Sequence, residues 1–283
     1  QYMTDPQIYS ADKCWCENAC RVADKILDFV RSHPEVTNEN VVDDLDKAGA
    51  KVVDSLDSVP DGRPVLLRAH GTHVDIVEEA KNKKMNIVDA TCPLVRDIHD
   101  EIKTLEADGR KIIIIGDHGH DEVVGIASQV KDPIIVATAD EATELRKTKR
   151  AGVVSQSTQT IENVQDIINI LMSKVVDLRF INTICFPTKR NQEQIKELSK
   201  QCDVMFVIGS FTSANSKRLT DLSKERNSRS YQVTCASDID EKWLDNCETV
   251  GISAGASTPD NIIGEVLNKI KEIGNVQEEE IYA

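Results

Sequence analysis

The sequence predicts an α/β protein in which parallel strands are joined by crossover helices. Short β-branched runs alternate with amphipathic helical segments along almost the whole of the 283-residue chain, which is the pattern of repeated βαβ units. Four consecutive isoleucines, Ile112–Ile115, indicate a strand that is buried on both faces. Small and hydroxyl-bearing residues follow several of the expected strands, at the end of a parallel sheet where ligands usually bind.

Each expected strand is a short apolar or β-branched run between turn-forming residues, and each expected helix repeats apolar residues at helical spacing. The expected strands, in chain order, are Val65–Arg68, Ile87–Asp89, Lys111–Gly116, Pro133–Ala137, Gly152–Ser155, Val204–Gly209, Ser230–Val233 and Val250–Ser253. The expected helices are Asn18–Val30, Val74–Lys81, Val95–Asp108, Ile161–Lys174, Gln192–Gln201, Ser216–Glu225 and Pro259–Ile273.

Composition excludes several classes of protein. The net charge of −14 argues against a nucleic-acid or anionic-membrane binder, because such proteins carry basic patches. Aromatic residues make up only 4% of the chain, too few for base-stacking platforms. No apolar run approaches the roughly 20 residues that span a bilayer, and no signal peptide is visible. We therefore expect a cytoplasmic protein, or an organellar one if a transit peptide was removed.

Four turns that follow expected strands form a candidate cradle for phosphate. A helix N-terminus presents unpaired N–H groups and the positive end of the helix dipole, so an acidic chain can still bind an anion there. N-capping alone also explains any single turn of this composition, although four in one chain favour an anion site. The turns are Ala69–Thr72, Ser155–Thr158, Gly209–Ser216 and Ser253–Ser257.

Three cysteines precede expected helices, where the helix dipole stabilises a thiolate. Cys92 and Cys185 each follow an apolar run, and Cys16 lies in a Cys-Trp-Cys sequence before the first helix. Each is compatible with a nucleophile, a metal ligand or a structural thiol. Their wide separation is unlike the close pairs of zinc ribbons, so spacing alone decides little. We interpret the remaining candidates outside the first motif as structural thiols: Cys202, Cys235 and Cys247.

Histidine and glutamate follow the four-isoleucine strand. His120 and Glu122 are placed where a strand end presents general acid–base groups, and His70 begins a similar turn. We expect His120 and Glu122 to serve the chemistry of the site.

At these residues the sequence resembles the LytB/IspH family of 4-hydroxy-3-methylbut-2-enyl diphosphate reductases. Six motifs occur in the order typical of that family, and the similarity runs from about Ile8 to Ile273. The motifs are Ala69-His70-Gly71, Ala90 to Val95, Gly116 to Glu122, Ser155 to Thr158, Ile184-Cys185-Phe186 and Ser253 to Pro259.

The resemblance implies a trefoil of three small α/β domains, with mostly parallel sheets, around a central iron–sulfur cluster cavity. Carried onto this chain, the domains are 1–92 with 269–283, then 93–181, then 182–268. Each domain would donate one ligand to a [4Fe–4S] cluster, namely Cys16, Cys92 and Cys185. One iron would stay open, with no protein ligand.

The resemblance also implies a reaction, the reductive dehydroxylation of the allylic diphosphate to isopentenyl and dimethylallyl diphosphate. The substrate oxygen would bind the open iron, and Glu122 would supply protons with Ser157 and His120. Reduced ferredoxin or flavodoxin would donate the electrons. Expected substrate-binding residues are Thr37, His70, His120, Thr158, Thr188, Ser213, Asn215 and Ser257.

The chain departs from the family pattern at several positions. The first motif reads Cys-Trp-Cys-Glu-Asn, without its two usual glycines, so Cys14 and Cys20 remain alternatives to Cys16 as the ligand. Thr37 replaces a diphosphate-binding histidine, and Ser157 replaces a threonine but keeps its hydroxyl. An Asn-Arg pair after the third cysteine is also transposed. The alternative hypothesis is a diverged relative that keeps the cluster but reduces another substrate or senses redox state.

Overall fold

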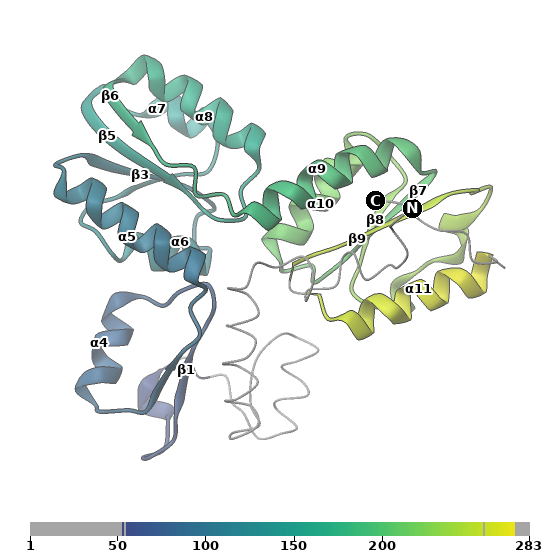
Figure 1. Cartoon of the computed structure of the whole chain (residues 1–283), viewed down its shortest axis with the longest axis horizontal. Helices are drawn as coiled ribbons and strands as arrows, with labels where there is room; N and C mark the ends of the chain where they lie inside the picture. Colours follow the sequence, from purple (N-terminus) through teal and green to yellow (C-terminus); the bar gives the residue numbers. More distant parts are fainter. Residues whose placement is uncertain (1–52, 54, 257, 275–283) are drawn as a thin grey trace, which may run out of the picture. The chain divides into compact units, whose positions relative to one another are not determined.

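The computed structural model describes residues 53, 55–256 and 258–274 (Figure 1). The chain divides into two compact units. Of the described residues, those up to Cys185 form the larger unit, and those from Phe186 onward form the C-terminal unit. Three separate sheets are present in the described residues, and every strand pair in them is parallel. The predicted α/β class is confirmed.

The first sheet of the larger unit has two strands, β1 (Val65–Leu67) and β2 (Ile87–Asp89). Helix α4 (Val74–Asn82) makes the crossover between them, as a parallel pair requires. A short 3₁₀ turn, η2 (Leu56–Ser58), precedes β1 and contributes Leu56 to a small apolar core.

The second sheet of the larger unit has four strands in the order β4-β3-β5-β6. The isoleucine run lies on β3 and is buried throughout, as its sequence predicts. Ile112 and Ile114 pack with α5 and α6, whereas Ile113 and Ile115 pack on the side of α7 and α8. The strands are β3 (Lys111–Ile115), β4 (Ile134–Val136), β5 (Thr148–Ser155) and β6 (Val175–Phe180). The helices are α5 (Pro93–Ala107), α6 (Asp121–Ala127), α7 (Ala139–Glu144) and α8 (Ile161–Lys174).

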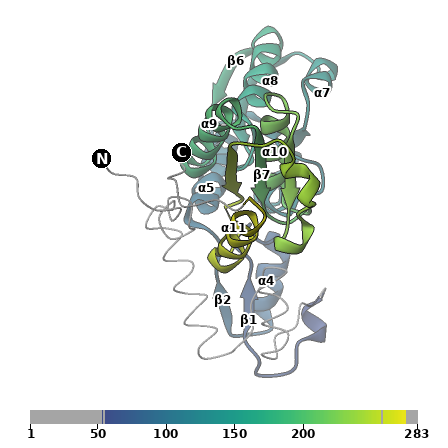
Figure 2. The same ribbon diagram turned by 90° about the vertical axis from the view of Figure 1, so that its right-hand side faces the viewer.

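The C-terminal unit is built on a three-stranded sheet in the order β8-β7-β9. Figure 2 labels its middle strand, β7, together with α9, α10 and α11. Met205 and Val207 pack against α9 and α10 on one face, while Phe206 and Ile208 pack with α11 on the other. The elements are α9 (Phe186–Gln201), β7 (Val204–Ile208), α10 (Ala214–Lys224), β8 (Ser230–Val233), η3 (Ala236–Asp238), η4 (Glu241–Leu244), β9 (Val250–Ala254) and α11 (Asp260–Gly274).

All eight expected strands are present, and α8 has the bounds predicted for it. The structure adds α6, α7 and β6, and it begins α9 at Phe186 instead of Gln192. Pro187 favours the earlier start, because proline is common in the first turn of a helix. The prediction began the helix too late because few residues of that turn are apolar. The expected helix Asn18–Val30 lies outside the described residues. In the described part of the chain, no helix is long and apolar enough to cross a membrane.

Gly152 tests the packing between β5 and α5. A Cβ atom there would lie 2.9 Å from Cβ of Leu105, so Gly152→Ala should lower the free energy of unfolding by about 1–3 kcal/mol through overpacking. Gly264→Ala is the matched control, because Gly264 lies on α11 with open space around it, and it should raise stability by about 0.5–1 kcal/mol. Denaturant unfolding followed by circular dichroism measures both changes, and an unaltered Gly152→Ala midpoint would contradict this packing.

Candidate functional site

Glu122 and Ser157 form a buried hydrogen-bonded pair. Glu122 lies in the first turn of α6 and is only 1% exposed. One carboxyl oxygen accepts the backbone N–H of Ser157 at 2.6 Å, and the other accepts its hydroxyl at 2.8 Å. The pair forms because β3 and β5 are neighbouring parallel strands, so the segments that follow their carboxyl ends meet. A carboxyl group is thereby held inside the protein with a hydroxyl directly on it.

His120 caps the helix that carries Glu122. Its Nδ1 atom accepts the backbone N–H of Glu122 at 3.1 Å, which places the proton of the neutral ring on Nε2. The ring of His70 meets that of His120 edge to face, with 5.8 Å between the ring centroids. His70 keeps an accessible surface, but partial burial lowers its pKa, and the neighbouring His120 lowers it further. His70 is therefore neutral at pH 7.

Cys92 and Cys185 join the same constellation through the backbone. The N–H of Cys92 donates to the carbonyl of Ala69 at 2.9 Å, next to His70. The N–H of Cys185 donates to the carbonyl of Ser157 at 3.0 Å. The larger unit thus contains one continuous path of contacts, from Cys92 through the two histidines and Glu122 to Cys185.

Both thiols suit an iron–sulfur cluster. Cys92 is the N-cap of α5, Cys185 directly precedes α9, and neither forms a disulfide bond. Soft thiolates are the ligands that such clusters take, and helix N-termini favour the thiolate. Within the described residues, no three potential ligands form a group that could hold a metal ion. The third expected ligand, Cys16, lies outside them.

A second constellation lies in the C-terminal unit, where β7 and β9 end. Ser213 caps α10 by accepting the backbone N–H of Ser216 at 3.3 Å. The side chain of Asn215 is buried, and neither its oxygen nor its nitrogen has a hydrogen-bond partner in the structure. The hydroxyl of Ser216 is buried and also lacks one. Such atoms are costly to leave unpaired, which indicates a site for a polar ligand.

Two glycines allow this close packing. A Cβ atom on Gly209 would lie 2.2 Å from Oγ of Ser216, and one on Gly255 would lie 2.1 Å from the same atom. The N–H of Gly255 and the hydroxyl of Thr258 both donate to the carbonyl of Ile208 at 2.8 Å, which joins the ends of the two strands. Only residues without a side chain fit against Ser216 here. The sequence predicts an anion-binding turn over Gly209–Ser216, but Ser216 is not among the substrate-binding residues named from it.

The remaining predicted residues lie in both units. Thr158 is half-buried beside Ser157 and accepts the side-chain N–H of Gln156 at 3.1 Å. Thr188 is 3% exposed on α9, in the same unit as Ser213 and Asn215. Thr37 and Ser257 lie outside the described residues, as do the alternative ligands Cys14 and Cys20.

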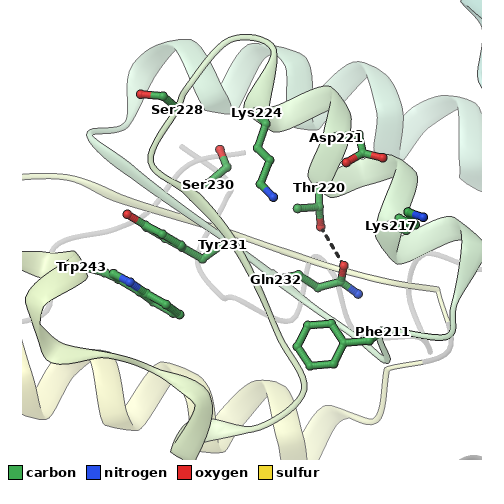
Figure 3. Close-up of a pocket in the computed structure, with 10 residues that line it drawn as sticks. All are labelled: Phe211, Lys217, Thr220, Asp221, Lys224, Ser228, Ser230, Tyr231, Gln232 and Trp243. Carbon is green, nitrogen blue, oxygen red and sulfur yellow. Dashed lines mark hydrogen bonds between the residues drawn. The ribbon is translucent and has the colours of Figure 1, made fainter.

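An open groove of about 550 Å³ lies between α10 and β8 (Figure 3). Lys217 and Lys224 line one side, and Tyr231 lies over Trp243 in a parallel stack with 4.1 Å between ring centroids. None of the predicted site residues lines this groove. The candidate functional residues therefore form two separate constellations at strand ends, one in each unit.

Comparison with known protein families matches residues 14–271 to the family described as LytB protein. The chain belongs to the LytB family. The 4-hydroxy-3-methylbut-2-enyl diphosphate reductase of Geobacter sulfurreducens is 37% identical over 243 residues, which cover 86% of each chain. The protein of the same name from Nitratiruptor is 34% identical over 258 residues, covering 91% of this chain and 94% of the relative.

Solved structures agree with this assignment. The LytB-family chain matches the E-1-hydroxy-2-methyl-but-2-enyl-4-diphosphate reductase of Plasmodium falciparum with a TM-score of 0.84 and 28% identity, over 91% of this chain and 85% of the other. A second solved structure, of (E)-4-hydroxy-3-methyl-but-2-enyl diphosphate reductase, matches with a TM-score of 0.65 and 30% identity. The match covers 91% of this chain and 96% of the other.

His99 of this LytB chain gives a pH-dependent test of the packing beneath the site. Burial first, and Lys103 second, lower the pKa of His99 to about 4, and its Nε2 atom is buried without a partner. The His99 ring takes up a proton near pH 6.5 in the unfolded chain but only near pH 4 in the folded chain. The free energy of unfolding is therefore highest above pH 6.5 and falls as the pH drops from 6.5 toward 4. Between pH 7 and pH 5, wild-type protein should lose up to about 2 kcal/mol more stability than His99→Gln.

Denaturant unfolding at the two pH values measures this difference. Equal losses for the two proteins would show that His99 is not held neutral.

Proposed function

We propose that this chain is a 4-hydroxy-3-methylbut-2-enyl diphosphate reductase that acts in the non-mevalonate pathway. The names of its relatives and its membership of the LytB family support the substrate and the reaction. The observation that carries the proposal is the buried Glu122 carboxyl group, hydrogen-bonded to Ser157, whose carbonyl in turn holds Cys185. A proton source and a thiol ligand thereby lie on one short path.

The cofactor we propose is a [4Fe–4S] cluster held by Cys16, Cys92 and Cys185. When bound, it supplies electrons one at a time and one iron without a protein ligand. The thiols of Cys92 and Cys185 fit it because both lie at helix N-termini, whose positive dipole ends offset the negative charge of the thiolates. The proposal includes the division into three α/β domains at 1–92 with 269–283, 93–181 and 182–268.

The reaction needs two electrons and two protons to convert the C–OH group of the substrate into C–H and water. Glu122 is the proposed proton source. In its protonated form, Glu122 would donate to Oγ of Ser157, the reverse of the hydrogen bond seen in the structure, across the same 2.8 Å. Its proton would then pass to that oxygen while the hydroxyl gives its own proton to the substrate. Burial of Glu122 keeps bulk water from this step. His120 positions Glu122 by capping its helix.

Ring, amide and hydroxyl donors would hold the diphosphate. His70 and His120 present ring N–H groups, and the partnerless amide of Asn215 supplies a buried donor at the start of α10. Neutral N–H and O–H groups with helix N-termini bind phosphate without a basic patch, which suits a chain with a net charge of −14. The other donors in the proposal are Thr37, Thr158, Thr188, Ser213 and Ser257.

Reduced ferredoxin or flavodoxin is the proposed electron donor. The alternative is a diverged family member that reduces another substrate or senses redox state. Thr37 favours the alternative, because it stands where the family has a histidine that contacts the diphosphate.

Anaerobic turnover of reconstituted protein tests the proposal. With a reduced viologen and 4-hydroxy-3-methylbut-2-enyl diphosphate, wild-type protein should form both five-carbon diphosphates. Glu122→Gln should reduce turnover by about 10²–10⁴-fold, the usual contribution of a general acid, while the iron content is unchanged. The matched control is Glu141→Gln, a glutamate that pairs with His118 at the surface, away from this path.

Three outcomes separate the hypotheses. Product formation that needs Glu122 supports the reductase. Iron with no turnover of this substrate favours the alternative. Unchanged turnover in Glu122→Gln would contradict the proton path.

A further inference from the structure

Among the described strands, β6 is the outer strand at one edge of the four-stranded sheet. It is the last strand in the order β4-β3-β5-β6, and among the described strands it pairs only with β5. The N–H of Ile181 donates to the carbonyl of Val153 on β5 at 2.9 Å. Asp177 and Arg179 lie four and two residues before Ile181, so their N–H and C=O groups also point toward β5. The alternate residues Val176, Leu178 and Phe180 therefore direct their N–H and C=O groups away from the sheet.

The side chains at this edge are also unusual. Val176 is 87% exposed and Met172, at the end of α8, is 67% exposed. Edge strands normally carry protective features such as prolines, bulges or charges, because an open edge pairs readily with another chain. The two charges of β6, Asp177 and Arg179, have opposite signs, so they do not oppose pairing with a strand that places them across from each other. On β6, Leu178 and Phe180 pack partly against the core that contains α7 and α8, and Val176 alternates in register with them but is exposed. Asp177 and Arg179 alternate with these residues and therefore lie on the opposite face.

We propose that β6 pairs antiparallel with β6 of a second copy of this chain, about a two-fold axis at Leu178. The sequence Val176-Asp177-Leu178-Arg179-Phe180 is self-complementary in that register. Leu178 lies opposite Leu178, Val176 opposite Phe180, and Asp177 opposite Arg179 of the second copy. One face of the paired β6 strands is then apolar, and the other face carries two pairs of opposite charge.

Hydrogen-bonding geometry agrees with this register. In an antiparallel pair, residues that direct both backbone groups outward must face each other. Leu178 facing Leu178, and Val176 facing Phe180, meet that condition. The neighbouring registers with the same backbone pairing would place Asp177 opposite Asp177, or Arg179 opposite Arg179. Like charges directly opposite each other destabilise a strand pair, so charge selects the register centred on Leu178.

Ion pairs within the chain hold the Asp177 carboxylate in a fixed position on β6. Arg110 donates to its carboxylate at 2.9 Å and Arg150 at 3.1 Å, while 48% of the Asp177 side chain stays exposed. The carboxylate is thus fixed on one face of β6 with room for a further cation. Pairing of two copies would join two four-stranded sheets into one continuous sheet, a closed two-fold arrangement that leaves neither β6 edge open.

Sedimentation of the anaerobically purified protein tests the proposal, independently of any activity. Wild-type protein should dimerise with a measurable Kd. Val176→Lys, which places a charge against Phe180 of the second copy, should raise that Kd at least about tenfold. Arg179→Glu should do the same by opposing Asp177, whereas Arg179→Lys should keep the dimer. The matched control is Ile76→Lys, another exposed apolar residue, on α4.

Hydrogen exchange identifies the surface that is used. Amides of Val176, Leu178 and Phe180 should gain protection as protein concentration rises, in step with dimer formation. Circular dichroism checks that the variants are folded. A wild-type monomer at every concentration would overturn the proposal, and so would a dimer that Val176→Lys and Arg179→Glu leave intact.

Discussion

The hydrogen bonds between Glu122 and Ser157 are the interaction on which the rest of the candidate site depends. A carboxyl group that is 1% exposed is stable only with hydrogen-bond partners. Ser157 supplies one donor to each carboxyl oxygen, its backbone N–H and its hydroxyl. Those bonds require β3 and β5 to be adjacent and parallel, α6 to begin at Asp121, and the turn after β5 to return toward α6. Through the carbonyl of Ser157, the same turn fixes the backbone of Cys185.

The proposed binding of a diphosphate by an acidic chain depends on the same architecture. Every strand that carries part of the site is parallel to its neighbours, so helix N-termini gather at one end of each sheet. The dipoles and N–H groups at those ends can bind an anion without lysine or arginine. Gly209 and Gly255 let the backbones approach Ser216. The adjacent Asn215 is buried with two polar atoms that have no partner in the structure, and a ligand can pair them.

Much of the fold followed from local sequence pattern, because buried strands and amphipathic helices carry strong periodicity. The run Ile112–Ile115 predicted a strand buried on both faces, and the structure confirms it. The prediction missed α6, since its seven residues are too few to show a helical period. It missed β6, because β6 begins at Val175 directly after α8 ends at Lys174, and no glycine or proline marks the boundary between them.

The site was predictable in part. Glu122, Ser157 and the cysteines were named from motifs, and the structure brings Glu122, Ser157 and Cys185 together. The tight fit of Ser216 between Gly209 and Gly255 could not be predicted, because it arises from the pairing of β7 with β9 across some 45 residues of sequence. Local patterns do not encode such contacts.

The most direct measurement compares anaerobic turnover of Ser157→Thr and Ser157→Ala, with iron content determined in both. If the hydroxyl of Ser157 carries the proton from Glu122, Ser157→Thr should keep most of the wild-type kcat. Ser157→Ala should lose about 10²-fold or more, the scale of a general-acid step, while it still binds iron. Equal kcat values for Ser157→Ala and the wild type would show that the hydroxyl bound to Glu122 is not on the proton path, and the central claim would be wrong.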